Sequence, residues 1–301
     1  MHRLVAHMDV FLTGGTGLVG SAVLLALLEE GHTVHALARS ERSARVLAST
    51  SAIVVRGDVG DPALLAEAAR SADGFVHTAA AADGEDAQRD AALLDAVLPV
   101  LAGTGKPYVH TSGVWAHGSG EIDEDTPFAP PQLTAWRLPL DARVRAAAAD
   151  GVRSVLIAPG IVHGRGLGLP TVVKDGPRTE DGALVLPGSG EQHWTTVHTD
   201  DLARLYVRAL TDAAPGSYYL GVSGANPTVR EIGEAASRGA GLDPATVPST
   251  DAETEARLGA LAGALALDQQ ATGAKARAEL DWKPTGPTLL EDLSSGSYVA
   301  A

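Results

Sequence analysis

The 301-residue chain contains no cysteine and has fewer basic than acidic residues. Without cysteine there can be no disulfide, no thiolate nucleophile and no cysteine-ligated metal. The 23 Lys and Arg against 37 Asp and Glu give a net charge of -14. This sign disfavours binding to a phosphate backbone, which depends on basic side chains. We therefore expect no nucleic-acid partner and interpret the charge as a solvated acidic surface.

Long hydrophobic runs are also missing from the sequence. No stretch reaches the roughly 20 apolar residues of a membrane span, and no secretory signal core is present. We expect no membrane partner and a cytoplasmic location. The opening MHRLVAH precedes a second methionine, Met8, where the first strand pattern starts, so we expect it to be an extension and not part of the fold.

Short apolar runs alternate with longer alanine-rich segments from Met8 to about Ile157. This alternation is typical of repeated βα units around a parallel sheet. The predicted strands are MDVFLT, TVHALA, AIVVRG, GFVHTA, PYVHTS and RSVLIA, and the predicted helices cover residues 18–30, 41–49, 62–70, 86–101 and about 140–150. The sequence thus predicts an α/β fold with a Rossmann-type, doubly wound parallel sheet.

The pattern changes after residue 158, where glycine and proline separate shorter elements. We expect a dinucleotide-binding core over 8–158 and, over 159–301, mainly a small C-terminal substrate-binding lobe, from which about 193–212 returns to the core. Within the second part, a helix should begin near Thr228, and 252–266 should form one ordinary helix. Such a lobe would close over the carboxyl ends of the strands, where open α/β sheets bind ligands.

The stretch TGGTGLVG, residues 13–20, lies between the first predicted strand and the first predicted helix. In that context a glycine triplet predicts a dinucleotide site, because glycine allows a tight turn and a close approach of the backbone to a pyrophosphate. The phosphate charge would also meet the positive end of the helix that starts near Leu18. The predicted cofactor contacts in this stretch are Gly14, Thr16, Gly17, Leu18 and Val19.

The end of the second predicted strand distinguishes NAD from NADP. An acidic residue there would accept the ribose hydroxyls of NAD, whereas an arginine can pair with the extra phosphate of NADP. The sequence has Ala38 at this position, followed by Arg39 and Ser40. It therefore favours NADP(H) over NAD(H), unless Arg39 is only a solvated loop charge.

Other residues are expected to line the same cofactor pocket. In GDVGD, a carboxylate could accept from the adenine amino group while the valine packs on the ring. HTAAA offers small residues close to the cofactor, and PGIV follows the sixth predicted strand. The predicted contacts are Asp58, Val59, Ala79, Ala80, Ala81, Thr111, Pro159, Gly160, Ile161 and Val162.

Taken together, six ordered motifs resemble those of the extended short-chain dehydrogenase/reductases, in the NAD-dependent epimerase/dehydratase family. They are TGGTGLVG, GDVGD, HTAA, PGIVHG, VHTDDLA and KARAELDWKP. The resemblance runs from Met8 to the C-terminus and implies a Rossmann-type sheet, a bound nicotinamide dinucleotide and a small C-terminal lobe. The oligomeric state stays open, although helices 86–101 and 140–150 are where this family often forms a homodimer.

The catalytic residues of that family do not all have counterparts here. Its members use Ser or Thr after the fifth strand and a YxxxK pair on the next helix, with Tyr as acid or base. Gly113 stands at the serine position, with Ser112 one residue earlier, and Trp136 and Leu140 stand at the YxxxK positions. Pro139 between them predicts that the helix starts late or bends. Cofactor binding is thus predicted, whereas family-type proton transfer is not.

Two residues after the fifth predicted strand are candidate catalytic groups. His117 could protonate an alkoxide or amide as hydride arrives, since an ordinary imidazole has a pKa of about 6.5. Ser112 could orient a carbonyl through its hydroxyl. The alternative for each is a structural role, as a packed histidine or as a strand-end hydroxyl near the cofactor.

A further set of residues is expected to line the substrate pocket: Trp115, Trp136, Arg137, His163, His193 and Trp194. Indoles and a guanidinium suit an aromatic or anionic substrate, although the tryptophans could instead pack at the interface of the two lobes. We expect no metal site, because His193 and His198 are too loosely spaced. Asp200 and Asp201 are expected to cap the helix that follows them.

The leading hypothesis is an atypical NADPH-dependent reductase acting on a carbonyl or imine of a small organic substrate. Two alternatives follow from the missing Tyr and Lys. One is a non-redox dehydratase, isomerase or cyclase on the same fold, and the other is a non-catalytic NADP-binding sensor.

Overall fold

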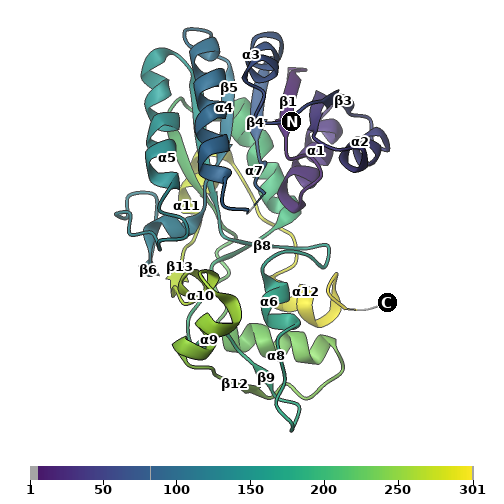
Figure 1. The fold of residues 1–301 in the computed structure, drawn as a ribbon, viewed down its shortest axis with the longest axis vertical. Helices are drawn as coiled ribbons and strands as arrows, with labels where there is room; N and C mark the ends of the chain where they lie inside the picture. The colour runs from purple at the N-terminus through teal and green to yellow at the C-terminus, as the bar shows by residue number, and fades with distance from the viewer. Residues whose placement is uncertain (1–5, 82, 300–301) are drawn as a thin grey trace.

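The computed structural model describes residues 6–81 and 83–299. Its centre is a seven-stranded sheet with the order β11-β7-β5-β4-β1-β2-β3 (Figure 1). All neighbouring strands in it are parallel. The strands are β1 (Asp9–Thr13), β2 (Thr33–Ala38), β3 (Ile53–Arg56), β4 (Gly74–His77), β5 (Pro107–Thr111), β7 (Arg153–Pro159) and β11 (Ser217–Gly221). The predicted Rossmann-type fold is confirmed.

Helices cover both faces of this sheet (Figure 1). One face carries α1 (Leu18–Glu29), α2 (Glu41–Ala48) and α7 (Thr199–Asp212), and the other carries α3 (Pro62–Ser71), α4 (Asp86–Leu101) and α5 (Arg137–Ala146). The strands send alternate side chains to the two faces, so that Val10 and Leu12 join one hydrophobic core and Phe11 joins the other. Burial on both faces explains why the strands other than β3, whose residues are exposed or half-buried, are nearly continuous apolar runs.

The edge strand β11 was not predicted as part of the core. It pairs in parallel with β7 over five residues, which places Tyr218 and Tyr219 in the main sheet, although residues 159–301 were expected to form mainly the C-terminal lobe. The core therefore recruits both α7 and β11 from the second half of the chain. Two segments that follow residue 158 thus complete the sheet domain.

The lower lobe in Figure 1 has its own hydrophobic core, formed mainly by three helices. These are α6 (Pro170–Lys174), α8 (Val229–Gly239) and α12 (Leu289–Ser295). The remaining helices and strands, from both parts of the described chain, are η1 (Val114–His117), η2 (Ala147–Asp150), α9 (Asp251–Leu258), α10 (Leu261–Leu265), α11 (Ala274–Leu280) and the short strands β6 (Gly120–Glu121), β8 (Ile161–His163), β9 (Leu184–Val185), β10 (Thr196–His198), β12 (Thr246–Val247) and β13 (Gln269–Gln270).

Local signals explain where several helices begin and end. Thr228 caps α8 in a capping box with Glu231, as the predicted start near this residue requires. The prediction of a single helix over 252–266 is wrong, because Gly259, with φ +57°, ends α9, and α10 follows as a separate helix. Helix α5 starts at Arg137, so Pro139 falls in its first turn, where a missing N–H leaves no intrahelical bond unmade.

The start of α7 also differs from the expectation. The cap is the ring of His198, which accepts from the backbone N–H of Asp200. Asp201 is buried and accepts from the backbone N–H groups of Thr285 and Gly286. This carboxylate therefore fixes a distant loop rather than capping its own helix.

In the segment expected to be an extension, residues 1–5 lie outside the described part. The His7 ring contacts the carbonyl of Gly31 at 2.7 Å and the Thr33 hydroxyl at 3.1 Å.

Among the described residues, no helix is long and apolar enough to cross a membrane.

Candidate functional site

The turn between β1 and α1 is built so tightly that side chains are excluded. Gly14 has φ +77°, and a Cβ there would lie 2.7 Å from the backbone nitrogen of Ala79. A Cβ on Gly20 would lie 2.1 Å from the carbonyl oxygen of Gly14. Helix α1 starts after Gly17, and no side chain caps it. Its first N–H groups therefore remain available for an anion such as a phosphate.

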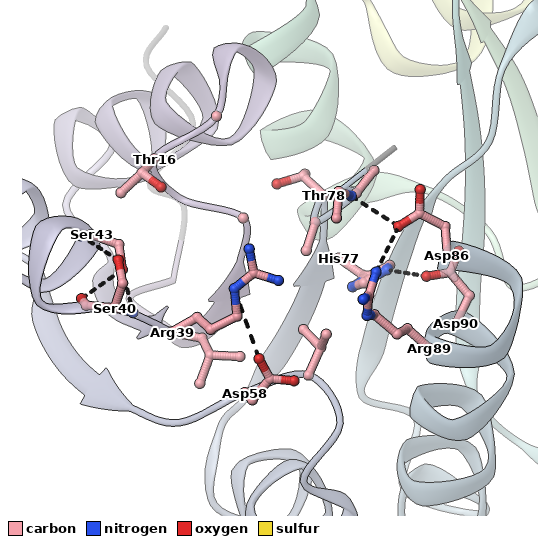
Figure 2. A pocket seen from close by; sticks show the side chains of 17 residues that line it. Thr16, Arg39, Ser40, Ser43, Asp58, His77, Thr78, Asp86, Arg89 and Asp90 are labelled. Atoms are coloured by element: carbon pink, nitrogen blue, oxygen red, sulfur yellow. Dashed lines mark hydrogen bonds and ion pairs between the residues drawn. The ribbon is translucent and has the colours of Figure 1, made fainter. Parts of the chain in front are cut away.

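The end of β2 lies next to the start of α2. Ala38 is buried, and Arg39 extends from the strand end into the space below the glycine turn (Figure 2). The Arg39 Nε lies 3.9 Å from the Asp58 carboxylate, and both side chains are largely exposed. Ser40 caps α2 in a reciprocal arrangement with Ser43. The strand end thus presents a guanidinium, two hydroxyls and a helix N-terminus, and no carboxylate of its own.

These elements enclose a pocket of about 300 Å³ at the carboxyl ends of β1, β2 and β4 (Figure 2). Open α/β sheets bind their ligands at this edge, where strand order reverses. Ten of the residues predicted to contact the cofactor line it together: Gly14, Thr16, Gly17, Arg39, Ser40, Asp58, Val59, Ala79, Ala80 and Ala81. The donor set and the glycine cradle fit a dinucleotide.

The pocket is completed by residues that the sequence analysis did not select, namely Leu37, Ser43, His77, Thr78, Asp86, Arg89 and Asp90. Several of them come from α4, which faces the glycine turn across the pocket (Figure 2). Arg89 donates to Asp83 at 2.6 and 2.9 Å and to Glu85 at 2.8 Å. This guanidinium is therefore already held by carboxylates, in contrast to Arg39.

A buried polar chain extends from the pocket wall into the sheet. His77 contacts Thr13 at 2.7 Å and Asp90 at 3.1 Å, and its ring stacks on His110. Because a carboxylate can only accept, Nε2 of His77 carries the proton and Nδ1 accepts from the threonine. The Tyr108 hydroxyl is 2.8 Å from Nδ1 of His110, and burial lowers the pKa of this histidine well below its usual value. The one acidic member, Asp90, is thus hydrogen-bonded to the His77 ring and lies 3.9 Å from Nε2 of His110.

Seven predicted cofactor residues do not line this pocket. Leu18 and Val19 occupy the first turn of α1, and the Thr111 hydroxyl is bonded to the carbonyl of His77 and the hydroxyl of Tyr206. The other four, Pro159, Gly160, Ile161 and Val162, lie at the end of β7 and in β8. A Cβ on Gly160 would lie 2.6 Å from the carbonyl oxygen of Thr195, so this glycine is explained by close packing against the residue that precedes β10.

At the end of β5, Ser112 is buried and faces α5. Its hydroxyl donates to Oδ2 of Asp141 at 2.5 Å. Arg137, one turn earlier on the helix, stacks on Trp136 with 4.4 Å between the guanidinium carbon and the ring centroid, and donates to the carbonyl of Thr111 at 3.3 Å. Asp141 is a residue that the sequence analysis missed, because the motif comparison pointed to Trp136 and Leu140.

His117, predicted to supply a proton, lies in a packed environment. Its ring is 2% exposed and contacts the Thr126 carbonyl and the Tyr218 hydroxyl, each at 2.8 Å, and it packs against Phe128. Burial lowers the pKa of His117, so the ring is neutral at pH 7. The structure favours the structural alternative and corrects the catalytic one, because both ring nitrogens already have partners.

The six residues expected at the substrate pocket separate into two groups. Trp115 and Trp136 are half-buried, with Trp115 packed against the cores of both lobes, and Arg137 and His193 are also partly exposed. His193 is paired with Asp268 at 2.8 Å. His163 and Trp194 are corrections: both are almost fully buried, with His163 near Asp292 and the Trp194 indole bonded to the carbonyl of Leu265. Neither can touch a substrate.

No group of three or more His, Cys, Asp and Glu that could hold a metal occurs within residues 6–81 and 83–299.

Comparison with known proteins adds to this geometry. A profile of the NAD dependent epimerase/dehydratase family matches residues 10–136. An uncharacterised protein of Schizosaccharomyces pombe is 32% identical over 302 residues, which cover 97% of this chain and all of that protein. Two reductases are more distant: 2-alkyl-3-oxoalkanoate reductase of Stenotrophomonas maltophilia (28% identity; 70% of this chain, 67% of that protein) and vestitone reductase of Medicago sativa (27%; 70% and 75%).

Solved structures share the whole architecture. A double mutant of dTDP-glucose 4,6-dehydratase from Streptomyces venezuelae with bound NAD superposes with a TM-score of 0.75 at 22% identity, covering 96% of each chain. UDP-glucose 4-epimerase of Thermus thermophilus in complex with NAD gives 0.74 at 19% identity, over 97% of this chain and 99% of that one. At this identity the likeness concerns the fold. The chain belongs to the NAD-dependent epimerase/dehydratase family, whose members are NAD(P)-dependent oxidoreductases, epimerases and dehydratases.

Proposed function

We propose that the protein is an NADPH-dependent reductase of a carbonyl or imine in a small organic substrate. The observation that carries this proposal is the end of β2, where buried Ala38 replaces an acid and Arg39, Ser40 and Ser43 line the pocket. An acid would repel the extra phosphate of NADP, whereas a guanidinium can bind it through charge-assisted hydrogen bonds.

Arg39 is free to make that contact. Its ion pair with Asp58 is long, at 3.9 Å, and the two side chains are 63% and 46% exposed. Exposed pairs of this kind contribute little, about 0–1 kcal/mol, so a phosphate dianion can displace the carboxylate. The N-terminus of α2, capped by Ser40, adds a favourable electrostatic environment for the same phosphate.

The remaining pocket residues have assigned places in this proposal. The glycine turn and the uncapped start of α1 would hold the pyrophosphate, and Asp58 and Val59 would contact the adenine. When bound, the cofactor supplies the hydride. The chain supplies position, charge and the proton.

The substrate class follows from the side chains at the junction of the lobes. Trp115 and Trp136 offer indole faces, and Arg137 offers a guanidinium stacked on one of them. This set suits an aromatic or anionic substrate. The names of two relatives, which are reductases, support a redox reaction over the dehydratase and isomerase alternatives.

The decisive experiment has two stages. The protein is titrated separately with NADPH and NADH, and cofactor fluorescence is followed. NADPH oxidation is then measured at 340 nm against a panel of aldehydes, ketones and cyclic imines. We expect tighter binding of NADPH and consumption with at least one substrate. Preference for NADH, binding of neither cofactor, or substrate conversion without a change in nicotinamide absorbance would each overturn the proposal.

We also propose a homodimer formed through α4 and α5, which lie side by side on one face of the sheet (Figure 1). Light scattering after size-exclusion chromatography checks it: a mass near 61 kDa, twice the 30.7 kDa of the chain, is expected, and a mass of one chain would contradict it.

A further inference from the structure

The helix that follows the loop after β5 presents an unexpected pair of residues to that strand. Arg137 and Asp141 are four apart, so they lie one above the other on the same face of α5. Arg137 donates to the carbonyl of Thr111, and Asp141 accepts from the hydroxyl of Ser112. The residues of α5 in contact with the end of β5 are therefore shifted by one position from the Trp136 and Leu140 of the motif comparison.

The Ser112–Asp141 contact is short and buried. The oxygens are 2.5 Å apart, and the residues are 6% and 4% exposed. The second carboxyl oxygen of Asp141, Oδ1, is buried and has no hydrogen-bond partner in the described structure. An ionised carboxylate with one unsolvated oxygen is costly, so this environment favours the protonated acid.

The charges around Asp141 come from three elements. Asp90 on α4 disfavours ionisation, while Arg137 and Arg145 on α5 favour it, and Tyr218 on β11 also faces the group. Burial is the dominant influence and raises the pKa of Asp141 to about 6. The acid can therefore gain and lose its proton near neutral pH.

The residue after Ser112 is Gly113. Apart from its chain neighbours, no heavy atom lies within 4 Å of the position that a Cβ would take on this glycine. This glycine stands at the carboxyl end of β5, on the edge of the sheet where the cofactor pocket also lies. A substrate oxygen would approach the serine hydroxyl from the side of this glycine.

We propose that Asp141 supplies the proton of the reduction through Ser112, in place of the tyrosine used by other members of the family. This inference rests on the proposed reductase function. Asp141 does not touch the substrate and is a positioning residue that acts through the hydroxyl. When Asp141 is ionised, Ser112 donates to it. When Asp141 is protonated, it donates to Ser112, whose own proton is then available to a substrate oxygen.

With a carbonyl substrate, the carbonyl carbon would accept the hydride that bound NADPH supplies, and the π electron pair would move to the oxygen. The Ser112 O–H bond breaks as the substrate O–H bond forms, and the proton of Asp141 restores the serine hydroxyl. The products are the alcohol, NADP⁺ and the Asp141 carboxylate, which takes one proton from water before the next turnover.

The test combines a titration and a rate measurement on the intact protein. Aspartate carboxyl carbons are labelled with ¹³C, and the signal missing from Asp141→Asn is followed by NMR against pH in wild type and in Ser112→Ala. We expect an Asp141 pKa near 6 in wild type and a higher value in Ser112→Ala, because the serine hydrogen bond stabilises the carboxylate.

Turnover at saturating NADPH is measured from pH 5 to 9 with a substrate found in the panel. The wild-type rate should fall as pH rises above about 6, and Asp141→Asn should be at least about 100-fold slower at pH 6, with that pH dependence lost. Ser112→Ala, which removes only a hydroxyl, should show the same loss. It keeps the test informative in the event that Asp141→Asn folds poorly. Asp150→Asn removes an equal but exposed charge just beyond α5 and should follow wild type.

Three results decide the matter. An Asp141 pKa near 4, or a pH profile unchanged in Asp141→Asn, overturns the proton path while leaving the reductase function intact. If the wild-type protein fails to oxidise NADPH with every substrate of the panel, the reductase function is overturned. In that case a titration near pH 6 that moves in Ser112→Ala would still support the coupling of the two residues.

Discussion

The cofactor pocket and the end of β5 are formed by different parts of the chain. In the pocket, backbone shape defines the site: glycines at 14, 17 and 20 bring strand, turn and helix together. At the end of β5, side chains define it: Ser112, Asp141 and His117 are buried, and their partners come from other elements.

The two regions therefore differ in how easily they can be recognised in the sequence. A glycine turn is a local feature, so its spacing identifies it. A buried carboxylate and its partner are brought together by helix packing, and their separation of 29 residues leaves no local pattern. The following experiments test whether the two regions really depend on backbone shape and on side-chain chemistry, respectively.

The largest effect is expected for Gly14→Ala. The new Cβ would force the β1 turn away from the backbone at Ala79, since only 2.7 Å separates them. We expect NADPH binding to weaken by more than about 100-fold, or about 3 kcal/mol. Fluorescence titration measures it.

The matched control is Gly31→Ala. Gly31 has a similar φ of +85° but no neighbour within 4 Å of a Cβ. Both variants carry the same left-handed strain of about 1–2 kcal/mol. If Gly31→Ala weakened NADPH binding as much as Gly14→Ala, strain rather than the shape of the cradle would be responsible.

The next effect concerns stability at the end of β5. The pKa of Asp141 rises from 3.8 to about 6 on folding, so the folded state holds its proton more tightly than the unfolded state. Wild type should therefore lose stability as pH rises from about 4 to about 6, with no further loss from this group above that range. Asp141→Asn, which cannot ionise, should be the more stable protein at pH 7, by up to about 3 kcal/mol.

Urea unfolding of both proteins at pH 4, 5, 6 and 7 checks this. Only the difference between the two proteins is informative, because other groups titrate in the same range. Asp150→Asn serves as the exposed control, with an expected difference near zero at every pH. A difference that stays constant from pH 4 to 7 would show that burial does not perturb Asp141.

A smaller effect is expected for Arg39→Ala in the cofactor pocket. Loss of one charge-assisted contact to a phosphate costs about 1.5–2 kcal/mol, so NADPH should bind about 10 to 30-fold more weakly. NADH, which lacks that phosphate, should bind nearly as in wild type. Arg42→Ala removes an exposed arginine of α2 that does not line the pocket, and it should leave both affinities unchanged. Equal losses for NADPH and NADH in Arg39→Ala would place the guanidinium elsewhere on the cofactor.

The fold could be predicted wherever local chemistry determines an element. Six strands of the main sheet were identified because strands buried on both faces are apolar runs between turns. Strand β11 was not identified as part of the main sheet, because its place beside β7 depends on the return of the chain after α7. The pairs β6–β13, β8–β10 and β9–β12 are two or three residues long and carry no periodic signal.

The site followed the same division. Ten pocket residues were found because they adjoin strand ends, but His77, Asp90 and Asp141 were missed. A weak signal existed for them: each is a polar residue in an apolar strand or on the inner face of a helix. To use this signal, one would have to know how α4 and α5 are rotated about their axes, which tertiary packing decides. His163 and Trp194 were placed in the pocket by motif and composition, although both belong to the core of the structure.

The smallest effect is expected for His117→Gln, a substitution in the segment that follows β5. The imidazole donates through Nδ1 to the Thr126 carbonyl and accepts through Nε2 from the Tyr218 hydroxyl, and a glutamine amide can provide one donor and one acceptor. Burial lowers the pKa of His117, so at pH 7 the ring is neutral and its single N–H proton is already donated to Thr126. We expect a loss of about 1 kcal/mol in stability from imperfect packing and a rate within about threefold of wild type. Thermal unfolding and turnover, measured on the same preparation, check both. A rate reduced about 100-fold at unchanged stability would restore His117 as the proton donor and remove the need for Asp141.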